Sequence, residues 1–392
     1  MSDSPFRQNA DLRAATRLAH DAPQDRHSVT PPVFQSSLFC FDTVEEMAAR
    51  FRGENQAYVY SRGDNPGVEA FEQKIAALEG AEAARAFSSG MGAISATLMS
   101  LLQAGARVVC VRDVYADTYR FLEKLMSRYG VRTEYVDGCD RAALAAALPG
   151  ASVLYLESPT SWTFRTQDLA HAAQAARAHG VVTVCDNSWA TPLHQQPLAL
   201  GIDLVLHSAS KYIGGHSDTV AGVVAGSKAR IAALNALSYP YLGAKLAPWE
   251  AWLLLRGMRT LDVRLRAQWA CAEALMEKLA SHAAVRRILH PAWQCGPGNQ
   301  YLHGFSSLFS IELDAAYDPL RFCNALRLFK RGVSWGGHES LALPAQVALQ
   351  GAAPNAQADF GVSPALVRLY IGLEDMHDLW RDLEQGLAQA VC

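Results

Sequence analysis

A lysine and an aspartate of this chain each stand at or just beyond the end of an apolar segment. Lys211 comes after DLVLH, inside HSASKYIGGHSD (207–218), and Asp186 ends VVTVCD. A lysine that can form an imine and a carboxylate that can keep a ring nitrogen protonated are the two groups that a pyridoxal phosphate (PLP) site needs. We therefore predict that Lys211 holds PLP and acts as catalytic base, and that Asp186 faces the pyridine nitrogen. The alternatives are a surface lysine and a helix-capping aspartate.

A glycine-containing turn, FSSGMGA (87–93), supplies a candidate phosphate site. Glycines let backbone N–H groups approach an anion, and the helix that follows directs its positive end toward it. Gly90 and Met91 are therefore predicted to bind the cofactor, with the hydroxyl groups of Ser208 and Ser210 as further phosphate donors. An ordinary helix N-cap is the alternative explanation of this turn.

Substrate and ring contacts are predicted from polar residues placed beside apolar segments. Tyr115 follows a segment that ends at Val111. Its ring is predicted to lie against the cofactor, and its hydroxyl to protonate a leaving group. An ordinary tyrosine at a helix start is the alternative. Arg368 lies inside the apolar segment ALVRLYIG, and its guanidinium is predicted to bind the α-carboxylate of an amino acid. An internal salt bridge is the alternative. Ser334 and Trp335 are predicted to line the same pocket, although the two glycines after them also suit a simple turn.

These side chains require a sheet whose strands end at a common edge. Apolar segments at 106–111, 131–136, 152–157, 181–186, 203–208 and 221–226 alternate with segments of helical periodicity. This alternation indicates a mostly parallel sheet that helices cover on both faces, with ligands at the carboxyl ends of its strands. Helices are predicted at 68–79, 91–103, 117–129, 140–148, 167–179 and 247–281. We divide the chain into an extended arm (1–62), a PLP-binding α/β domain (63–256) and a smaller α+β domain (257–392).

Composition excludes several classes of partner. The chain has 392 residues, 50% hydrophobic composition and a net charge of −3, so neither nucleic acid nor an anionic membrane is an expected partner. No segment approaches the ~18 apolar residues of a membrane span, and the N-terminal sequence lacks the apolar core of a secretory signal. The eight cysteines form no CxxC and no Cys/His cluster. We therefore predict a cytoplasmic protein with reduced thiols and no metal site.

Several long segments jointly resemble the Cys/Met metabolism family of PLP enzymes, in its cystathionine lyase and synthase group. The segments are VYSRGDNPGVEAFEQKIAALEG (59–80), YLESPT (155–160), IDLVLHSASKYIGGHSD (202–218), RGMRTLDVRL (256–265), SWGGHESL (334–341) and VRLYIGLED (367–375). The resemblance implies the fold-type I PLP-dependent transferase architecture, α/β with a large, mostly parallel seven-stranded sheet and a smaller α+β C-terminal domain. It also implies a homotetramer of two tight dimers, in which Tyr60 and Arg62 of the arm bind the phosphate of the neighbouring subunit's PLP.

Within this family, the resemblance favours α,β-elimination from cystathionine and related cysteine S-conjugates. The products would be homocysteine or another thiol, pyruvate and ammonia, a trans-sulfuration step of methionine biosynthesis. SWGG, Ser161 and Trp189 are similar to bacterial cystathionine β-lyases, and Val333 replaces a glutamate that many γ-acting members carry.

Other positions depart from the β-lyase pattern. SRGDNP (61–66) resembles γ-acting members, and His338 stands where β-lyases are expected to have tyrosine. A cystathionine γ-lyase, a γ-synthase or an O-acylhomoserine sulfhydrylase is therefore the alternative. A non-catalytic protein on the same fold is disfavoured, because Lys211, Asp186 and Arg368 are all present.

Overall fold

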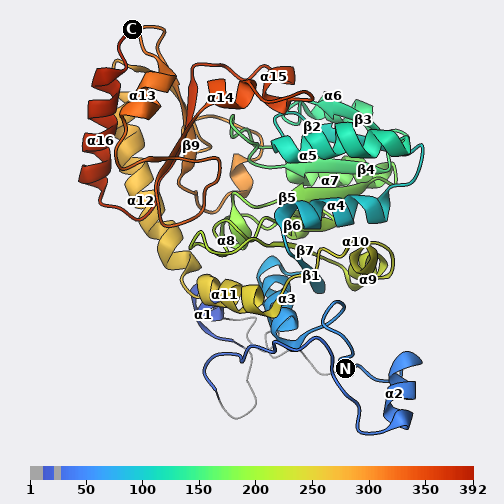
Figure 1. The fold of residues 1–392 in the computed structure, drawn as a ribbon. Coiled ribbons are helices and arrows are strands. Elements are labelled where there is room, and N and C mark those ends of the chain that lie inside the picture. Colours follow the sequence, from blue (N-terminus) through green and yellow to red (C-terminus); the bar gives the residue numbers. More distant parts are fainter. Residues whose placement is uncertain (1–11, 22–27) are drawn as a thin grey trace.

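The computed structural model describes residues 12–21 and 28–392. Its framework is two sheets, which Figure 1 shows side by side, with α16 on the outer side of the smaller one. The predicted arm includes residues 1–11 and 22–27, which lie outside the described residues. The proposed boundaries at 62/63 and 256/257 stay a prediction.

The larger sheet has seven strands in the order β1-β7-β6-β5-β4-β2-β3. Strand β7 pairs antiparallel with both of its neighbours, and the other pairs are parallel. This arrangement confirms the predicted mostly parallel, seven-stranded sheet. The strands are β1 (Ala83–Phe87), β2 (Arg107–Val111), β3 (Arg132–Val136), β4 (Val153–Glu157), β5 (Val182–Asp186), β6 (Leu204–His207) and β7 (Gly222–Gly226).

Helices cover both faces of this sheet, because its strands are apolar on both sides. On one face, a core that includes Tyr155 and Val184 packs against α4 (Gly90–Leu101), α5 (Ala116–Arg120) and α9 (Lys228–Leu237). The opposite face is covered by α3 (Pro66–Glu79), α6 (Arg141–Ala147), α7 (Leu169–Ala178) and α11 (Pro248–Met258). Two short helices, α8 (Thr191–His194) and α10 (Tyr239–Leu242), lie in the connections.

The smaller sheet has the order β10-β11-β12-β9-β8 and its own core. The strands are β8 (Val285–Leu289), β9 (Leu308–Leu313), β10 (Lys330–Arg331), β11 (Leu341–Pro344) and β12 (Leu366–Tyr370). The helices of this part are α12 (Leu261–Ala280), α13 (Pro319–Ala325), α14 (Ala345–Leu349), α15 (Ala356–Asp359) and α16 (Met376–Gln389). The predicted smaller α+β unit is therefore confirmed. No helix in the described residues combines the length and apolar character of a membrane crossing.

Two of the predicted helices are interrupted. The segment 117–129 consists of α5, a π-helical turn (Phe121–Leu125) and a 3-10 turn (Met126–Tyr129). The segment 247–281 is divided, because α11 ends at Met258 and α12 begins at Leu261. The Gly257 carbonyl, near the end of α11, accepts hydrogen bonds from the Arg264 guanidinium at 2.9 Å and from the Thr260 hydroxyl at 3.1 Å.

The sequence analysis gave no residue range for several elements, among them strand β1, helix α9 and two helices of the arm. Strand β1 is alanine-rich and carries little intrinsic strand preference, so its pairing with β7 decides its conformation. The arm contains α1 (Ala14–Ala19) and α2 (Val44–Phe51). Helix α2 begins where the Thr43 side chain accepts a hydrogen bond from the Glu46 N–H, yet it has no buried residue.

Candidate active site

Most of the predicted chemistry-bearing residues meet in one cavity of about 670 Å³. Strands β4, β5 and β6 end at this cavity, and the smaller sheet contributes Arg368 from β12. The placement at the carboxyl ends of parallel strands is the expected one for an α/β sheet. Of the residues predicted for the site, the lining includes Gly90, Met91, Tyr115, Asp186, Ser208, Ser210, Lys211, Ser334, Trp335 and Arg368.

Lys211 reaches the cavity from the loop that follows β6. Its Nζ donates a hydrogen bond to the Ser334 Oγ at 2.6 Å. Burial lowers the pKa of Lys211 to about 8, with a further lowering from the charge of Arg368 and an opposing effect from Asp186. Lys211 is therefore no ordinary surface lysine, because its amine can be neutral near physiological pH.

Asp186 ends β5 and is 91% buried, with only 9% of its surface exposed. Its Oδ1 accepts the Ser188 N–H at 2.9 Å. Burial raises the pKa of Asp186, whereas the Ser188 hydrogen bonds and the charges of His207 and Lys211 lower it. The capping alternative fails, because the next helix, α8, has Ala190 at its N-cap and no side-chain cap.

The glycine-containing turn forms the N-terminus of α4 at the cavity wall. Ser89 caps this helix by accepting the Gly92 N–H at 2.9 Å, so the capping alternative is correct and is compatible with anion binding. A Cβ on Gly90 would lie 3.0 Å from the Ser208 Cβ and Oγ. Glycine therefore lets the N-terminus of α4 approach Ser208, so that the positive end of the helix and the Ser208 hydroxyl can bind one anion together.

Ser210 makes different contacts from those predicted. Its hydroxyl donates to the Ala221 carbonyl at 3.1 Å and accepts the Ala221 N–H at 2.9 Å. These bonds hold the lysine loop against the start of β7. The single hydroxyl hydrogen of Ser210 is already donated to the Ala221 carbonyl, so Ser210 can donate to a phosphate only if that bond breaks.

Tyr115 precedes α5 as its N-cap, and it also lines the cavity. Its N–H donates to the Glu157 Oε2 at 2.7 Å and its hydroxyl donates to the Asp117 Oδ2 at 2.9 Å. Burial, followed by the Asp117 charge and hydrogen bond, raises the pKa of Tyr115. The phenol therefore stays protonated at neutral pH.

Arg368 has no carboxylate partner in any ion pair of the described residues, which argues against the internal salt bridge. Its Nη2 donates to the Val333 carbonyl at 2.7 Å, and its guanidinium carbon lies 5.2 Å from the centre of the Trp162 ring. Burial lowers the pKa of Arg368 to about 10. A half-buried cation that lines the cavity and has no carboxylate partner is suited to an anionic substrate group.

Tyr60 and Arg62 do not line this cavity in the chain as described. The Arg62 guanidinium lies over the Tyr60 ring at 5.3 Å, on an arm that Figure 1 shows across the molecule from α16. Their predicted contact with a neighbouring subunit's cofactor stays a prediction.

Several lining residues were missed as functional residues by the sequence analysis, including Glu157, Trp162 and Glu339. Glu157 ends β4 beside Asp186 in register, so an acid at the end of a second strand was an available signal. Trp162 and Glu339 lie in loops, and only the packing of the two sheets brings them to the cavity. Their placement depends on tertiary contacts that spacing does not encode.

The donors at the cavity fit one kind of cofactor. A half-buried amine, a carboxylate and a helix N-terminus suit an aldehyde, a basic ring nitrogen and a phosphate, all of which PLP has. Gly336, whose φ is +94°, brings the 334–337 loop close to Lys211, because a Cβ there would lie 2.6 Å from the Lys211 Cα.

Comparisons with known proteins agree with this fit. A family model described as Cys/Met metabolism PLP-dependent enzyme matches residues 15–388. The chain is 41% identical to L-methionine gamma-lyase of Pseudomonas putida over 384 residues, 95% of this chain and 96% of the relative. It is 35% identical to cystathionine gamma-lyase of Bacillus subtilis, over 92% of this chain and 94% of the relative. A solved cystathionine gamma synthase of Xanthomonas oryzae pv. oryzae superposes with a TM-score of 0.89, at 35% identity and coverages of 96% and 98%.

Proposed function

Because the chain belongs to the Cys/Met metabolism family of PLP-dependent enzymes, we propose that it is a carbon–sulfur lyase acting at the γ-carbon of a sulfur-containing amino acid. Methionine and cystathionine are the candidate substrates, since relatives that cover nearly the whole chain are named for γ-elimination from them. This proposal replaces α,β-elimination of cystathionine as the leading interpretation. The similarity to γ-acting enzymes extends along the chain, whereas the β-lyase resemblance depends on a few positions.

The Lys211 amine at the cavity, which is half-buried, is the observation that carries the PLP chemistry of the proposal. With a pKa of about 8, the amine can accept a proton from the substrate's α-carbon. γ-Elimination also requires removal of a proton from the neighbouring β-carbon, and the same amine would accept it. Its hydrogen bond to Ser334 keeps the amine at the cavity wall. When bound, PLP supplies an electron sink for the negative charge that develops on the substrate.

Two further residues are given roles in this proposal. The Arg368 guanidinium would hold the substrate α-carboxylate, which fixes the α-carbon relative to Lys211. Tyr115, protonated at neutral pH, would act as a donor toward the departing sulfur. Asp186 would stay ionised against the ring nitrogen, and Gly90, Met91 and Ser208 would surround the phosphate.

A second candidate, α,β-elimination, is favoured by the wall of the cavity near Lys211. Trp335 lies with its ring centre 5.4 Å from the Lys211 Nζ, and Val333 presents an exposed apolar side chain at the cavity. Neither of these two side chains offers an anion for a distal ammonium group. Of the two eliminations, only α,β-elimination of cystathionine yields homocysteine, so the assignment to methionine biosynthesis goes with this candidate and not with γ-elimination.

Product analysis with L-cystathionine tests the two candidates directly. γ-Elimination gives 2-oxobutyrate and cysteine, whereas α,β-elimination gives pyruvate and homocysteine. We expect mainly 2-oxobutyrate, together with 2-oxobutyrate and methanethiol from L-methionine. Lys211→Ala is the matched control and should form neither keto acid. Pyruvate as the main product would overturn the γ-assignment and leave the cofactor site intact. Net formation of cystathionine from a homoserine ester and cysteine would instead indicate γ-replacement.

For the assembly, we propose a cytoplasmic homotetramer built from two tight dimers. The support is the family membership and the exposed apolar side chains of the arm, among them Val29, Val44 and Phe51. Val44 and Phe51 line one apolar groove, and exposed apolar surface of this kind is typical of a protein–protein interface.

A further inference from the structure

Asp117 lies two residues after Tyr115 and contacts the hydroxyl of this proposed proton donor. Its Oδ2 accepts the Tyr115 hydroxyl at 2.9 Å, and its Oδ1 accepts the Arg120 Nη1 at 2.8 Å. The three residues belong to α5 or to its N-cap, so a short stretch of backbone fixes their spacing. Each carboxylate oxygen of Asp117 therefore has a donor, and the orientation of the carboxylate is set from both sides.

Tyr115 is thereby held at its backbone and at the tip of its side chain. Its N–H donates to the Glu157 Oε2 at 2.7 Å, and its hydroxyl donates to Asp117. A phenol hydroxyl has a single hydrogen to donate. In this structure that hydrogen is directed to Asp117, so a departing sulfur has to compete with the Asp117 carboxylate for it.

The charged groups that face Tyr115 act in two directions. Burial raises the pKa of the phenol most, and three acids raise it further: Asp117, Asp186 and Glu157. Two cations that line the same cavity favour the phenolate: Lys211 and Arg368. The balance decides whether the phenol keeps its proton as the pH rises.

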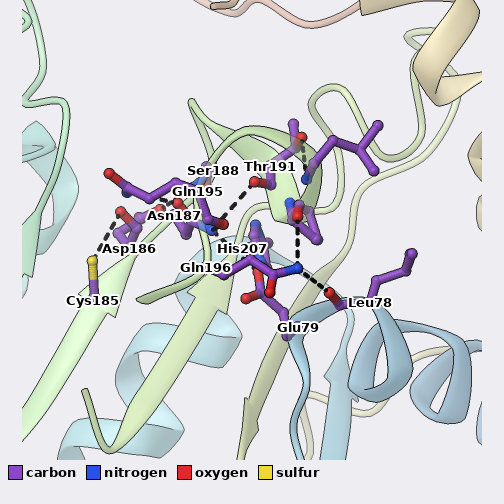
Figure 2. Close-up of polar contacts among 12 residues, drawn as sticks. Leu78, Glu79, Cys185, Asp186, Asn187, Ser188, Thr191, Gln195, Gln196 and His207 are labelled. Atoms are coloured by element: carbon purple, nitrogen blue, oxygen red, sulfur yellow. Dashed lines mark hydrogen bonds and ion pairs between the residues drawn. The ribbon is translucent and has the colours of Figure 1, made fainter. Parts of the chain in front are cut away.

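Asp117 differs from the other two acids because it touches the hydroxyl. Asp186 accepts the Ser188 N–H at 2.9 Å (Figure 2), and Glu157 accepts the backbone N–H of Tyr115. Among the described residues, Asp117 alone accepts the Tyr115 hydroxyl hydrogen. Its charge is therefore the one that a phenolate would meet at hydrogen-bond distance.

We infer that Asp117 is a positioning residue for Tyr115. Held by Arg120, the Asp117 carboxylate orients the Tyr115 hydroxyl and disfavours the phenolate, so that Tyr115 keeps its proton at the wall of the cavity. The alternative is an ordinary acid in the first turn of a helix, paired with a basic residue three positions later. That alternative explains the Arg120 contact but not the bond to Tyr115. The inference rests on the proposed role of Tyr115 as a donor, and it holds for either elimination.

The test measures the ionisation of the phenol at position 115 in the full-length protein as purified. 3-Fluorotyrosine is introduced in place of Tyr115, and its ¹⁹F chemical shift distinguishes phenol from phenolate as the pH rises. In Asp117→Asn the side chain keeps its size and an acceptor oxygen but loses its charge. We expect the midpoint of ionisation to fall by about one pH unit, a tenfold change in the ratio of phenol to phenolate, since burial and the other acids still act.

Two matched variants separate the charge of Asp117 from the structure of α5. Arg120→Met breaks the ion pair on the helix but leaves the Asp117 carboxylate, so it should not lower the midpoint. Asp359→Asn removes a different carboxylate, which accepts the hydroxyl of Tyr119 on the same helix at 2.7 Å, and should leave the signal of position 115 unchanged. If Arg120→Met lowers the midpoint as much as Asp117→Asn does, a structural change of α5 explains both and the inference is overturned.

Tyr115→Phe distinguishes failure of the inference from failure of the proposed function. If this variant releases keto acid from L-cystathionine at the wild-type rate, Tyr115 is not the required donor, whatever the ¹⁹F result. If Tyr115→Phe is slow but Asp117→Asn keeps the wild-type midpoint, the positioning role of Asp117 is refuted alone. The absence of ionisation in both fluorinated proteins, across the pH range in which they stay folded, would refute it too, because Asp117 would then not be what retains the proton.

Discussion

At the scale of single residues, the environment of Lys211 predicts a measurable pH dependence. Its pKa is lowered to about 8 by burial and by Arg368, and Asp186 opposes the lowering. Only the neutral amine attacks an aldehyde, and the ammonium loses its proton as pH rises. PLP uptake by the cofactor-free protein should therefore accelerate as pH rises through about 8, which stopped-flow absorbance can follow.

Two substitutions should shift the midpoint of this pH dependence in opposite directions. Arg368→Leu removes a nearby cation and should move the midpoint of the uptake rate to higher pH. Asp186→Asn removes an anion that stabilises the ammonium and should move the midpoint to lower pH. The midpoint is read separately from the final amount of bound PLP, which either substitution can reduce. An unchanged midpoint in both variants would mean that these charges do not control Lys211.

Residues whose local context is unusual could be predicted from the sequence. Lys211 lies among small hydroxyl residues, and Arg368 interrupts an apolar segment, so each is visible within a short window. The contact between His207 and Glu79 was not predicted, because the two residues are 128 positions apart in the chain. A pair formed across a helix and a strand becomes visible only when the fold brings the two elements together.

At the scale of elements, Gly336 couples the 334–337 loop to the lysine loop. Alanine there would meet the Lys211 backbone at 2.6 Å, and the φ of +94° is unfavourable for any side chain. We expect Gly336→Ala to lower the free energy of unfolding by about 2–5 kcal/mol, from backbone strain plus overpacking. It should also weaken PLP binding, because Lys211 must shift. Denaturant unfolding and PLP titration measure the two effects.

Gly361→Ala is the matched control for strain alone. Gly361 has a φ of +75°, but a Cβ there would meet no atom within 4 Å. Its substitution should cost about 1–2 kcal/mol and leave PLP binding unchanged. If both variants lose equal stability and bind PLP equally well, the close approach of the two loops has no role in the site.

Strand positions were predicted more accurately than helix limits, for a physical reason. A buried parallel strand is a largely apolar segment, and four strands of this kind, β2, β4, β5 and β6, were placed to within a residue. Helix ends depend on polar contacts that come from elsewhere, such as the Arg264 hydrogen bond at the end of α11. Helix α2 did have a local signal, Thr43 three residues before Glu46, which is typical of a helix start.

At the scale of the whole molecule, the arm makes few packing contacts with the rest of its own chain. Helix α2 has no buried residue, and Tyr60 and Phe51 are 47% and 69% exposed. An apolar groove of about 540 Å³ runs along residues 38–44 of the arm and against Met47, Phe51 and Tyr60. An element with so little contact within its own chain is explained if it packs on a second copy.

Subunit mixing tests whether Arg62 completes a neighbour's site. Homodimers of Arg62→Ala or of Lys211→Ala should be inactive, but a hybrid dimer would contain one site with both residues intact. Random exchange of equal amounts should restore about a quarter of the wild-type activity, because half of the dimers are hybrids with one good site of two. Mixing Lys211→Ala with Asp186→Ala is the control and should restore none, since these two residues line the same cavity of one chain. If exchange is verified and the Arg62 mixture stays inactive, the arginine acts within its own chain, and the arm has another role.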